Sequence, residues 1–176
     1  MIFALLGPSG SGKTSLEKIL EEVYKYKRII SYTTRPPREH EINGIDYHFV
    51  TEREFILKNM IESTLYRGWR YGICADDIDY RNHNYILVVE PHGYQQIKDK
   101  IGKYIVSIFI KTDDRIRLIR MLQRGDDVDE VIRRFLSDKE LFKNFVANHI
   151  IENNKYIFDT AEEIKNIIER IDMAEK

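Results

Sequence analysis

The sequence predicts an α/β protein with a parallel sheet and helices on both faces of the sheet. Strand-length apolar runs alternate with amphipathic helical stretches along most of the chain, which is typical of a parallel sheet. Residues 33–82 break this alternation with several short strands and one helix, and we interpret them as an inserted lobe. The length of 176 residues suits one compact domain whose core needs no disulfide or metal.

The elements of the first half surround a glycine-rich stretch. Apolar or β-rich runs predict strands at residues 2–6, 28–32, 47–50 and 61–73, the last divided by a turn at Arg67 and Gly68. Apolar spacing predicts a helix at residues 13–24, and the capping box of Thr51 and Glu54 begins a second helix that ends near Met60. The polar residues 33–46 are expected to form a loop.

The second half continues the alternation. Strands are predicted at residues 85–89, at residues 104–110, and at either 149–151 or 156–158. Helices are predicted from Pro91 onward, at residues 113–123 and at about 127–146. Thr160 and Glu163 form a second capping box, which predicts a final helix that ends near Asp172.

The composition excludes several classes of partner and site. The net charge is -1, so no overall field draws the chain to nucleic acid or to a membrane surface, and we expect neither as a partner. No run approaches the roughly 18 apolar residues of a membrane span. The single cysteine, Cys74, rules out an intrachain disulfide and favours a cytoplasmic setting, and the five histidines show no metal-ligand spacing.

A phosphate-binding motif follows the first strand. The pattern G-x-x-x-x-G-K-[ST] is matched by Gly7, Pro8, Ser9, Gly10, Ser11, Gly12, Lys13 and Thr14. Glycines allow a tight loop whose N–H groups face phosphate oxygens, and the helix N-terminus adds partial positive charge. Lys13 is expected to bind the β- and γ-phosphates of a nucleoside triphosphate, and Thr14 to hold Mg²⁺. The motif alone does not separate a kinase from a switch GTPase or an ATPase.

A second candidate site lies in the polar stretch. Arg35 and Arg38 stand on a loop stiffened by Pro36 and Pro37, and Tyr47 follows shortly after. Two guanidinium groups and a phenol suit a phosphate dianion. On these residues alone, a solvated basic loop is an equally good interpretation.

The same stretch resembles the signature of the guanylate kinase family. The pattern T-T-R-x-x-R-x-x-E-x-x-G-x-x-Y-x-F is matched at Thr33, Thr34, Arg35, Arg38, Glu41, Gly44, Tyr47 and Phe49. Together with the phosphate motif, the resemblance covers essentially the whole chain. It implies a sheet of the P-loop NTPase type with an inserted mixed α/β lobe for GMP and a helical lid. The core would comprise residues 1–32, 83–119 and 141–176, the GMP-binding lobe residues 33–82, and the lid residues 120–140.

The resemblance also implies roles for single residues. Those expected to contact GMP are Arg35, Arg38, Tyr47 and Tyr71 at its phosphate, and Ser31 and Glu62 at its guanine. An ordinary exposed strand residue is the alternative for Glu62, and its spacing to Tyr71 and Gly72 favours the functional role. Asn153 would contact the adenine of ATP.

Two positions depart from the family pattern. Ile73 stands where the family usually has a serine that contacts the base, and its side chain forms no hydrogen bond. Val88 replaces the first of two acids around an apolar residue, which leaves Glu90 alone. Glu90 ends a parallel strand, where it would contact guanine or order Mg²⁺-bound water; the alternative is an acid that only favours the following helix N-terminus.

Arginines further along the chain resemble the lid of the family. Arg120 and Arg124 precede Gly125, and Arg134 follows it. Arginines that close over the site would neutralise the charge that builds up during phosphoryl transfer, and closure would exclude water. The alternative is a solvated helix whose arginines pair with neighbouring acids.

The sequence therefore predicts phosphoryl transfer from ATP to GMP or dGMP, with Mg²⁺ as cofactor. The free nucleotides would be the partners of a monomer or homodimer. Two alternatives stay open: a guanylate-kinase-like binding module with weak or no catalysis, and a P-loop kinase for another small phosphorylated substrate. Lys13 and Thr14 in register disfavour the first, and the set of Arg35, Arg38 and Tyr47 disfavours the second, which Ile73 keeps open.

Overall fold

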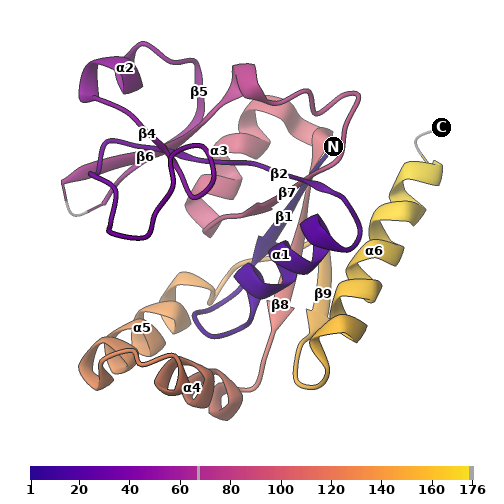
Figure 1. Ribbon diagram of the computed structural model, residues 1–176. Helices are drawn as coiled ribbons and strands as arrows, with labels where there is room; N and C mark the ends of the chain where they lie inside the picture. The colour runs from indigo at the N-terminus through magenta and orange to yellow at the C-terminus, as the bar shows by residue number, and fades with distance from the viewer. Residues whose placement is uncertain (67, 175–176) are drawn as a thin grey trace.

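The larger of two sheets carries the core of the molecule (Figure 1). The computed structural model describes residues 1–66 and 68–174. Within them the larger sheet has five strands in the order β2 (Lys27–Arg28), β7 (Tyr85–Val88), β1 (Ile2–Leu6), β8 (Ile105–Lys111) and β9 (His149–Glu152). Every neighbouring pair is parallel, which confirms the predicted parallel sheet. All residues of the central strand β1 are buried, as expected for a strand covered on both faces.

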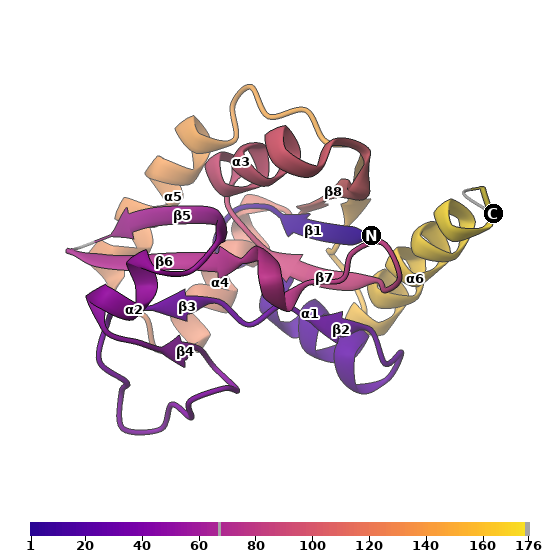
Figure 2. The same ribbon diagram turned by 90° about the horizontal axis from the view of Figure 1, so that it is seen from above.

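Helices cover both faces of this sheet (Figure 2). On one face lie α1 (Lys13–Glu22) and α6 (Ile157–Ala174), whose Leu16 and Ile164 belong to the same apolar cluster as Phe3. On the other face lies α3 (Pro91–Ile101), whose Ile97 packs in a second apolar cluster. None of the described helices is long and apolar enough to cross a membrane.

A smaller, mixed sheet stands beside the larger one. Its order is β4 (His48–Phe49), β3 (Tyr32–Thr33), β6 (Trp69–Cys74) and β5 (Met60–Tyr66). The strand predicted at residues 28–32 is therefore divided, because the chain leaves the larger sheet after β2 and enters the smaller one at β3. The capping box of Thr51 and Glu54 is present and begins α2 (Glu52–Ile56). Arg67, half of the predicted turn between β5 and β6, lies outside the described residues.

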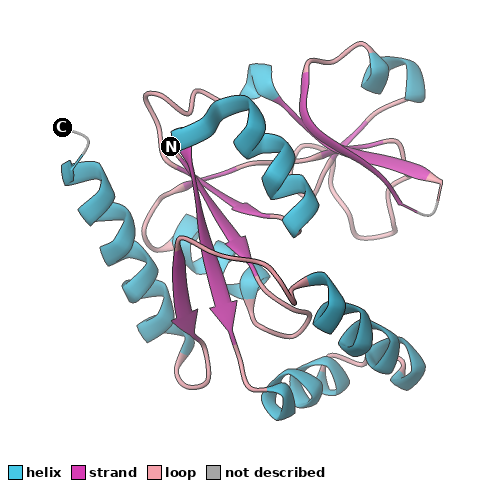
Figure 3. Cartoon of the chain, turned by 180° about the vertical axis from the view of Figure 1, so that it is seen from behind, coloured by secondary structure: helices cyan, strands magenta, loops and turns pink. Residues whose placement is uncertain are grey.

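Two further helices, α4 (Asp114–Gln123) and α5 (Val128–Leu141), lie beyond the carboxyl ends of the large sheet's strands (Figure 3). Short 3₁₀ turns occupy Ala75–Asp77 and Gly102–Tyr104. Of the two positions considered for the last strand, the structure has the first, β9. The prediction that Thr160 and Glu163 cap the final helix is wrong, because α6 begins at Ile157 and Thr160 lies inside it. The buried hydroxyl of Thr160 instead donates to Asn153 Oδ1 at 3.1 Å.

Candidate active site

The glycine-rich stretch forms a loop between β1 and α1 that curls around Lys13. The Lys13 Nζ donates to the carbonyl oxygens of Gly7 at 2.6 Å and Pro8 at 3.0 Å. Gly10 has a φ of +76°, and a Cβ there would lie 2.6 Å from the Arg117 carbonyl oxygen, so only glycine fits. The loop is thus a narrow turn with a cation at its centre, at the end of the sheet where α/β proteins bind ligands.

One cavity, here called the loop cavity, opens beside this loop and has a volume of about 410 Å³. It is lined by Ser9, Gly10, Gly12, Lys13, Thr14, Ser15, Arg120, Met121 and Arg124. Arg120 Nη2 donates to the Asn153 carbonyl oxygen at 3.2 Å, and Arg124 pairs with Asp126. Two of the three predicted arginines therefore line the loop cavity, and this cavity suits a polyanion.

The third predicted arginine lies elsewhere. Arg134 points along α5 and pairs with Glu130 at 2.9 Å and with Asp126 at 3.5 Å. It lines neither the loop cavity nor the second cavity described next. Arg134 would reach bound phosphates only after a movement of α5.

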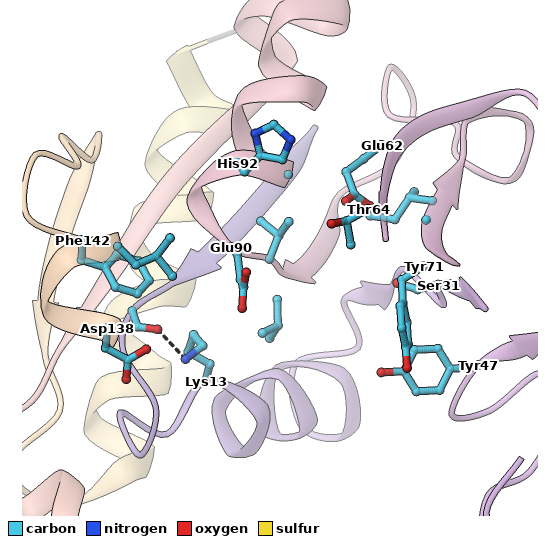
Figure 4. A pocket seen from close by; sticks show the side chains of 17 residues that line it. Lys13, Ser31, Tyr47, Glu62, Thr64, Tyr71, Glu90, His92, Asp138 and Phe142 are labelled. Carbon is cyan, nitrogen blue, oxygen red and sulfur yellow. Dashed lines mark hydrogen bonds between the residues drawn. The ribbon is translucent and has the colours of Figure 1, made fainter. Parts of the chain in front are cut away.

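A second cavity of about 300 Å³, here called the lobe cavity, lies between the two sheets (Figure 4). The larger sheet and its loops contribute Gly7, Lys13, Val88, Val89, Glu90, His92 and Gly93, and the smaller sheet side contributes Ser31, Tyr47, Glu62, Thr64, Tyr71, Gly72 and Ile73. Helix α5 and the residue that follows it add Asp138, Leu141 and Phe142. Lys13 lines both cavities, so the two cavities meet at one cation.

A cluster of arginine and tyrosine side chains closes one end of the lobe cavity. Arg35 Nε donates to the Tyr71 hydroxyl at 3.2 Å, and its guanidinium lies 5.7 Å from the Tyr47 ring centroid. Arg35 Nη2 also pairs with Glu41 Oε1 at 2.8 Å, and this contact holds the pKa of Glu41 below its ordinary value. The Arg38 side chain is exposed and lines neither cavity, although its backbone N–H also binds Glu41. The structure thus brings Arg35, Tyr47 and Tyr71 together and leaves Arg38 outside.

Glu62 also lines the lobe cavity and is buried on β5. Burial, followed by the repulsion of Glu90, raises the pKa of Glu62 to about 7. The register of β5 and β6 pairs Glu62 with Ile73 and Thr64 with Tyr71, and all four side chains line the cavity. Figure 4 shows Thr64 beside Glu62, whereas Ser31 lies with the two tyrosines.

Glu90 faces the cavity rather than the helix that follows it. It is the N-cap residue of α3, yet its side chain makes no capping hydrogen bond. The alternative interpretation, in which Glu90 only favours the N-terminus of the following helix, is therefore not supported by a capping hydrogen bond. Among the described residues no group of three His, Cys, Asp or Glu side chains is placed to hold a metal ion. Thr14 at the loop, with a phosphate-bearing ligand, fits Mg²⁺, which keeps few protein ligands.

Asn153, expected at the adenine, is fully buried and lines neither cavity. Its Nδ2 donates to the Ser11 carbonyl oxygen at 2.8 Å, and its Oδ1 accepts from Thr160 at 3.1 Å. Asn153 therefore supports the phosphate loop through its hydrogen bond to Ser11, and its side chain lines neither cavity.

Among the polar and charged residues of the lobe cavity, three were not predicted from the sequence: Thr64, His92 and Asp138. Thr64 follows Glu62 by two positions on one strand, and alternate residues of a strand lie on the same face. This spacing could have predicted that Thr64 lies beside Glu62. Asp138 comes from α5, far along the chain, and nothing in its sequence surroundings indicates the phosphate loop.

A parallel sheet that carries a phosphate loop, beside a second, mixed sheet, places the chain among α/β nucleotide-binding proteins. Comparisons with known proteins narrow this class. The family model described as guanylate kinase matches residues 2–171, and the chain belongs to the guanylate kinase family.

Individual relatives agree with this assignment. The guanylate kinase of Wolbachia pipientis wMel is 33% identical over 181 residues, covering 97% of this chain and 90% of the relative. The guanylate kinase of Mycoplasma genitalium is 33% identical over 178 residues, covering 95% of this chain and 74% of the relative. The crystal structure of guanylate kinase from Anaplasma phagocytophilum superposes with a TM-score of 0.71 at 25% identity, covering 97% of this chain and 85% of that one.

Proposed function

We propose that this protein is a guanylate kinase, which transfers the γ-phosphoryl group of ATP to GMP or dGMP and gives ADP and GDP or dGDP. The observation that carries this proposal is that Lys13 lines both the loop cavity and the lobe cavity. A triphosphate on the loop and a monophosphate between the sheets would then present their reacting ends to the same cation. Such positioning supplies much of the catalysis in phosphoryl transfer.

The donor would bind in the loop cavity. Residues 7–14 would surround its β- and γ-phosphates, and Arg120 and Arg124 would neutralise the charge that develops during transfer. Arg134 would join them when the lid, residues 120–140, closes. Thr14 would hold Mg²⁺, which neutralises phosphate charge when bound. Asn153 would support the donor site by bracing the loop.

The acceptor would bind in the lobe cavity, within a GMP-binding lobe of residues 33–82. Arg35, Tyr47 and Tyr71 support a phosphate site at one end, and Arg38 would swing in to complete it. Glu62 would face guanine, because a carboxylate accepts both N1–H and the exocyclic amine. Ser31, which the resemblance also implies at guanine, would reach the base from beside Tyr47 and Tyr71 (Figure 4). Glu90 would approach the same base or order water near Mg²⁺.

No side chain of this scheme is needed as a general base, since positioning and electrostatics account for the transfer. The single cysteine supports a cytoplasmic setting, and the net charge of -1 supports an enzyme that acts on free nucleotides without nucleic acid or a membrane. We expect it to work as a monomer or homodimer.

A coupled assay with ATP and each of GMP, dGMP, AMP, CMP and UMP tests the proposal. GMP and dGMP should be phosphorylated, and AMP should be slower by on the order of 100-fold, because a buried carboxylate facing the N1 lone pair of adenine loses its partners. Lys13→Ala should lose on the order of 1,000-fold in turnover and keep GMP binding. GMP binding without turnover in the wild type would indicate a binding module, and AMP activity within tenfold of GMP activity would indicate a different kinase.

A further inference from the structure

The scheme above leaves one buried carboxylate at the phosphate loop unused. Asp138, on α5, is 9% exposed, and its Oδ2 accepts the backbone N–H of Ser9 at 2.7 Å. The same oxygen accepts Arg117 Nη2 at 3.0 Å. Arg117, on α4, is 3% exposed, and its Nε donates to the Ser9 carbonyl oxygen at 2.9 Å. The acid and the arginine thus hold both peptide groups of one loop residue.

Asp138 also brings negative charge to the place where phosphates would bind. It lines the lobe cavity together with Lys13 and Glu90, and Figure 4 shows its carboxylate near the Lys13 ammonium. Burial lowers the pKa of Lys13 to about 8, and the charge of Asp138 is the largest contribution that opposes this shift. In the ligand-free protein the carboxylate therefore supplies part of the negative charge that a phosphate would supply to the loop.

We propose that Asp138 is a further residue of the donor site, an internal anion that occupies the Ser9 N–H until the terminal phosphate of the donor replaces it. The proposal rests on the assignment of ATP to the phosphate loop. A carboxylate and a phosphate repel each other at such short range, so binding of the triphosphate requires the carboxylate to leave the loop. Asp138 thereby sets the affinity of the enzyme for its donor.

The ion pairs around Arg117 allow this exchange without leaving that arginine unpaired. Arg117 Nη1 donates to Asp114 Oδ1 at 2.8 Å, and Asp114 sits on the exposed side of α4. When Asp138 leaves, Arg117 keeps Asp114 and its contact with the Ser9 carbonyl oxygen. Release of Asp138 also frees α5, the helix that carries Arg134, from the loop.

Isothermal titration calorimetry of the wild type, Asp138→Asn and Asp138→Ser tests the proposal, with ATP and inorganic tripolyphosphate as ligands in the presence of magnesium. Both variants should bind both ligands about tenfold more tightly than the wild type, because a nearby like charge is removed. Asparagine keeps an oxygen for the Ser9 N–H, and serine controls for the size of the side chain. Asp114→Asn is the matched control, because Asp114 pairs with the same arginine without touching the loop, and it should stay within about twofold of the wild type.

Affinity for GMP should rise much less than affinity for ATP in either Asp138 variant, since the Asp138 carboxylate lines the lobe cavity but accepts its hydrogen bond from the phosphate loop. Equal or weaker binding of ATP by folded Asp138→Asn and Asp138→Ser would overturn the proposal and give Asp138 a purely structural role. Similar tightening in Asp114→Asn would also overturn it, because the effect would then belong to Arg117. A wild type that binds no ATP would contradict the proposed function itself, which is a distinct result.

Discussion

Among single residues, Glu62 shows how burial gives an ordinary carboxyl a pH-dependent role. Its side chain is buried between the sheets, and burial raises its pKa to about 7. A carboxyl whose pKa is raised by folding stabilises the fold below its unfolded pKa of about 4.5, and this contribution is lost as the pH rises through 7. The ionised form, which guanine needs as an acceptor, is therefore the less stable form of the free protein.

We expect the KM for GMP to fall as the pH rises from about 6 to about 8, because ionised Glu62 accepts the guanine N–H groups. Glu62→Gln should remove this dependence and raise KM at high pH. Glu17→Gln is the matched control: burial raises the pKa of Glu17 to about 7 as well, but Glu17 lines neither cavity. Thermal melting should show a smaller loss of stability between pH 4.5 and 7 in both variants. A pH-independent KM in the wild type would show that Glu62 does not bind the base.

Thr64 is expected to supply the hydrogen bond that Ile73 cannot. Its hydroxyl makes no hydrogen bond to any described residue and stands on the cavity face of β5 beside Glu62. Thr64→Val should lower kcat/KM for GMP by about tenfold, the effect of one neutral hydrogen bond. The loss should shrink with 6-thio-GMP, whose sulfur is a weak acceptor.

Ser63→Ala is the control for Thr64→Val, because Ser63 faces away from the cavity and its N–H binds Gln96 at 3.1 Å. It should leave kcat/KM for GMP unchanged. An equal loss with GMP and with 6-thio-GMP would place the Thr64 hydroxyl away from the guanine oxygen.

Among the elements, the phosphate loop depends on the segment after β9. Asn153→Ala would leave the Thr160 hydroxyl without its buried partner and the Ser11 carbonyl oxygen with the Thr112 hydroxyl alone, at a cost of about 1–3 kcal/mol. We expect a lower melting temperature and weaker ATP binding, with GMP affinity unchanged. Asn154→Ala removes only exposed hydrogen bonds to Asp113 and should have little effect on any of these quantities. Equal loss of ATP and GMP binding in Asn153→Ala would indicate general unfolding rather than a loosened loop.

The elements also show what local patterns predict and what they miss. The capping box at Thr51 is present: the Thr51 hydroxyl accepts the Glu54 N–H, and the Glu54 carboxylate accepts the Thr51 N–H. At Thr160 the same pattern fails, because α6 starts earlier and the threonine hydroxyl is used by Asn153. The pattern at residues 28–32 predicted one strand, whereas the structure has β2 in the larger sheet and β3 in the smaller one. The division was not predictable, because hydrophobic alternation carries no information on which sheet a strand joins.

At the scale of the whole molecule, the meeting of two cavities at Lys13 has a direct consequence for ligands. A guanosine and an adenosine joined through five phosphates should occupy both cavities at once. We expect it to bind more tightly than ATP or GMP alone by on the order of 100-fold or more, because the second half binds at high effective concentration. Competition against each substrate measures this. An affinity no better than that of ATP would mean that the cavities are not filled together.

The candidate site was predictable where a local motif carries it. The phosphate loop follows from its motif, and the set of Arg35, Arg38, Tyr47 and Tyr71 follows from the resemblance to the family. The structure forms the loop and brings Arg35, Tyr47 and Tyr71 together, but it leaves Arg38 outside both cavities. Asp138 and the bracing role of Asn153 were not predictable, because both depend on how distant segments pack against the loop.

The strand pairing has a consequence for how the chain is made. Among the described strands, β1 pairs only with β7 and β8, and β2 pairs only with β7, so neither strand has a partner until residue 85 has left the ribosome. The strands of the smaller sheet all lie between Tyr32 and Cys74 and meet one another earlier. During synthesis the smaller sheet can therefore form before the larger one. The apolar N-terminal strand waits unpaired for the length of a whole lobe, and in that interval a nascent chain most needs protection from aggregation.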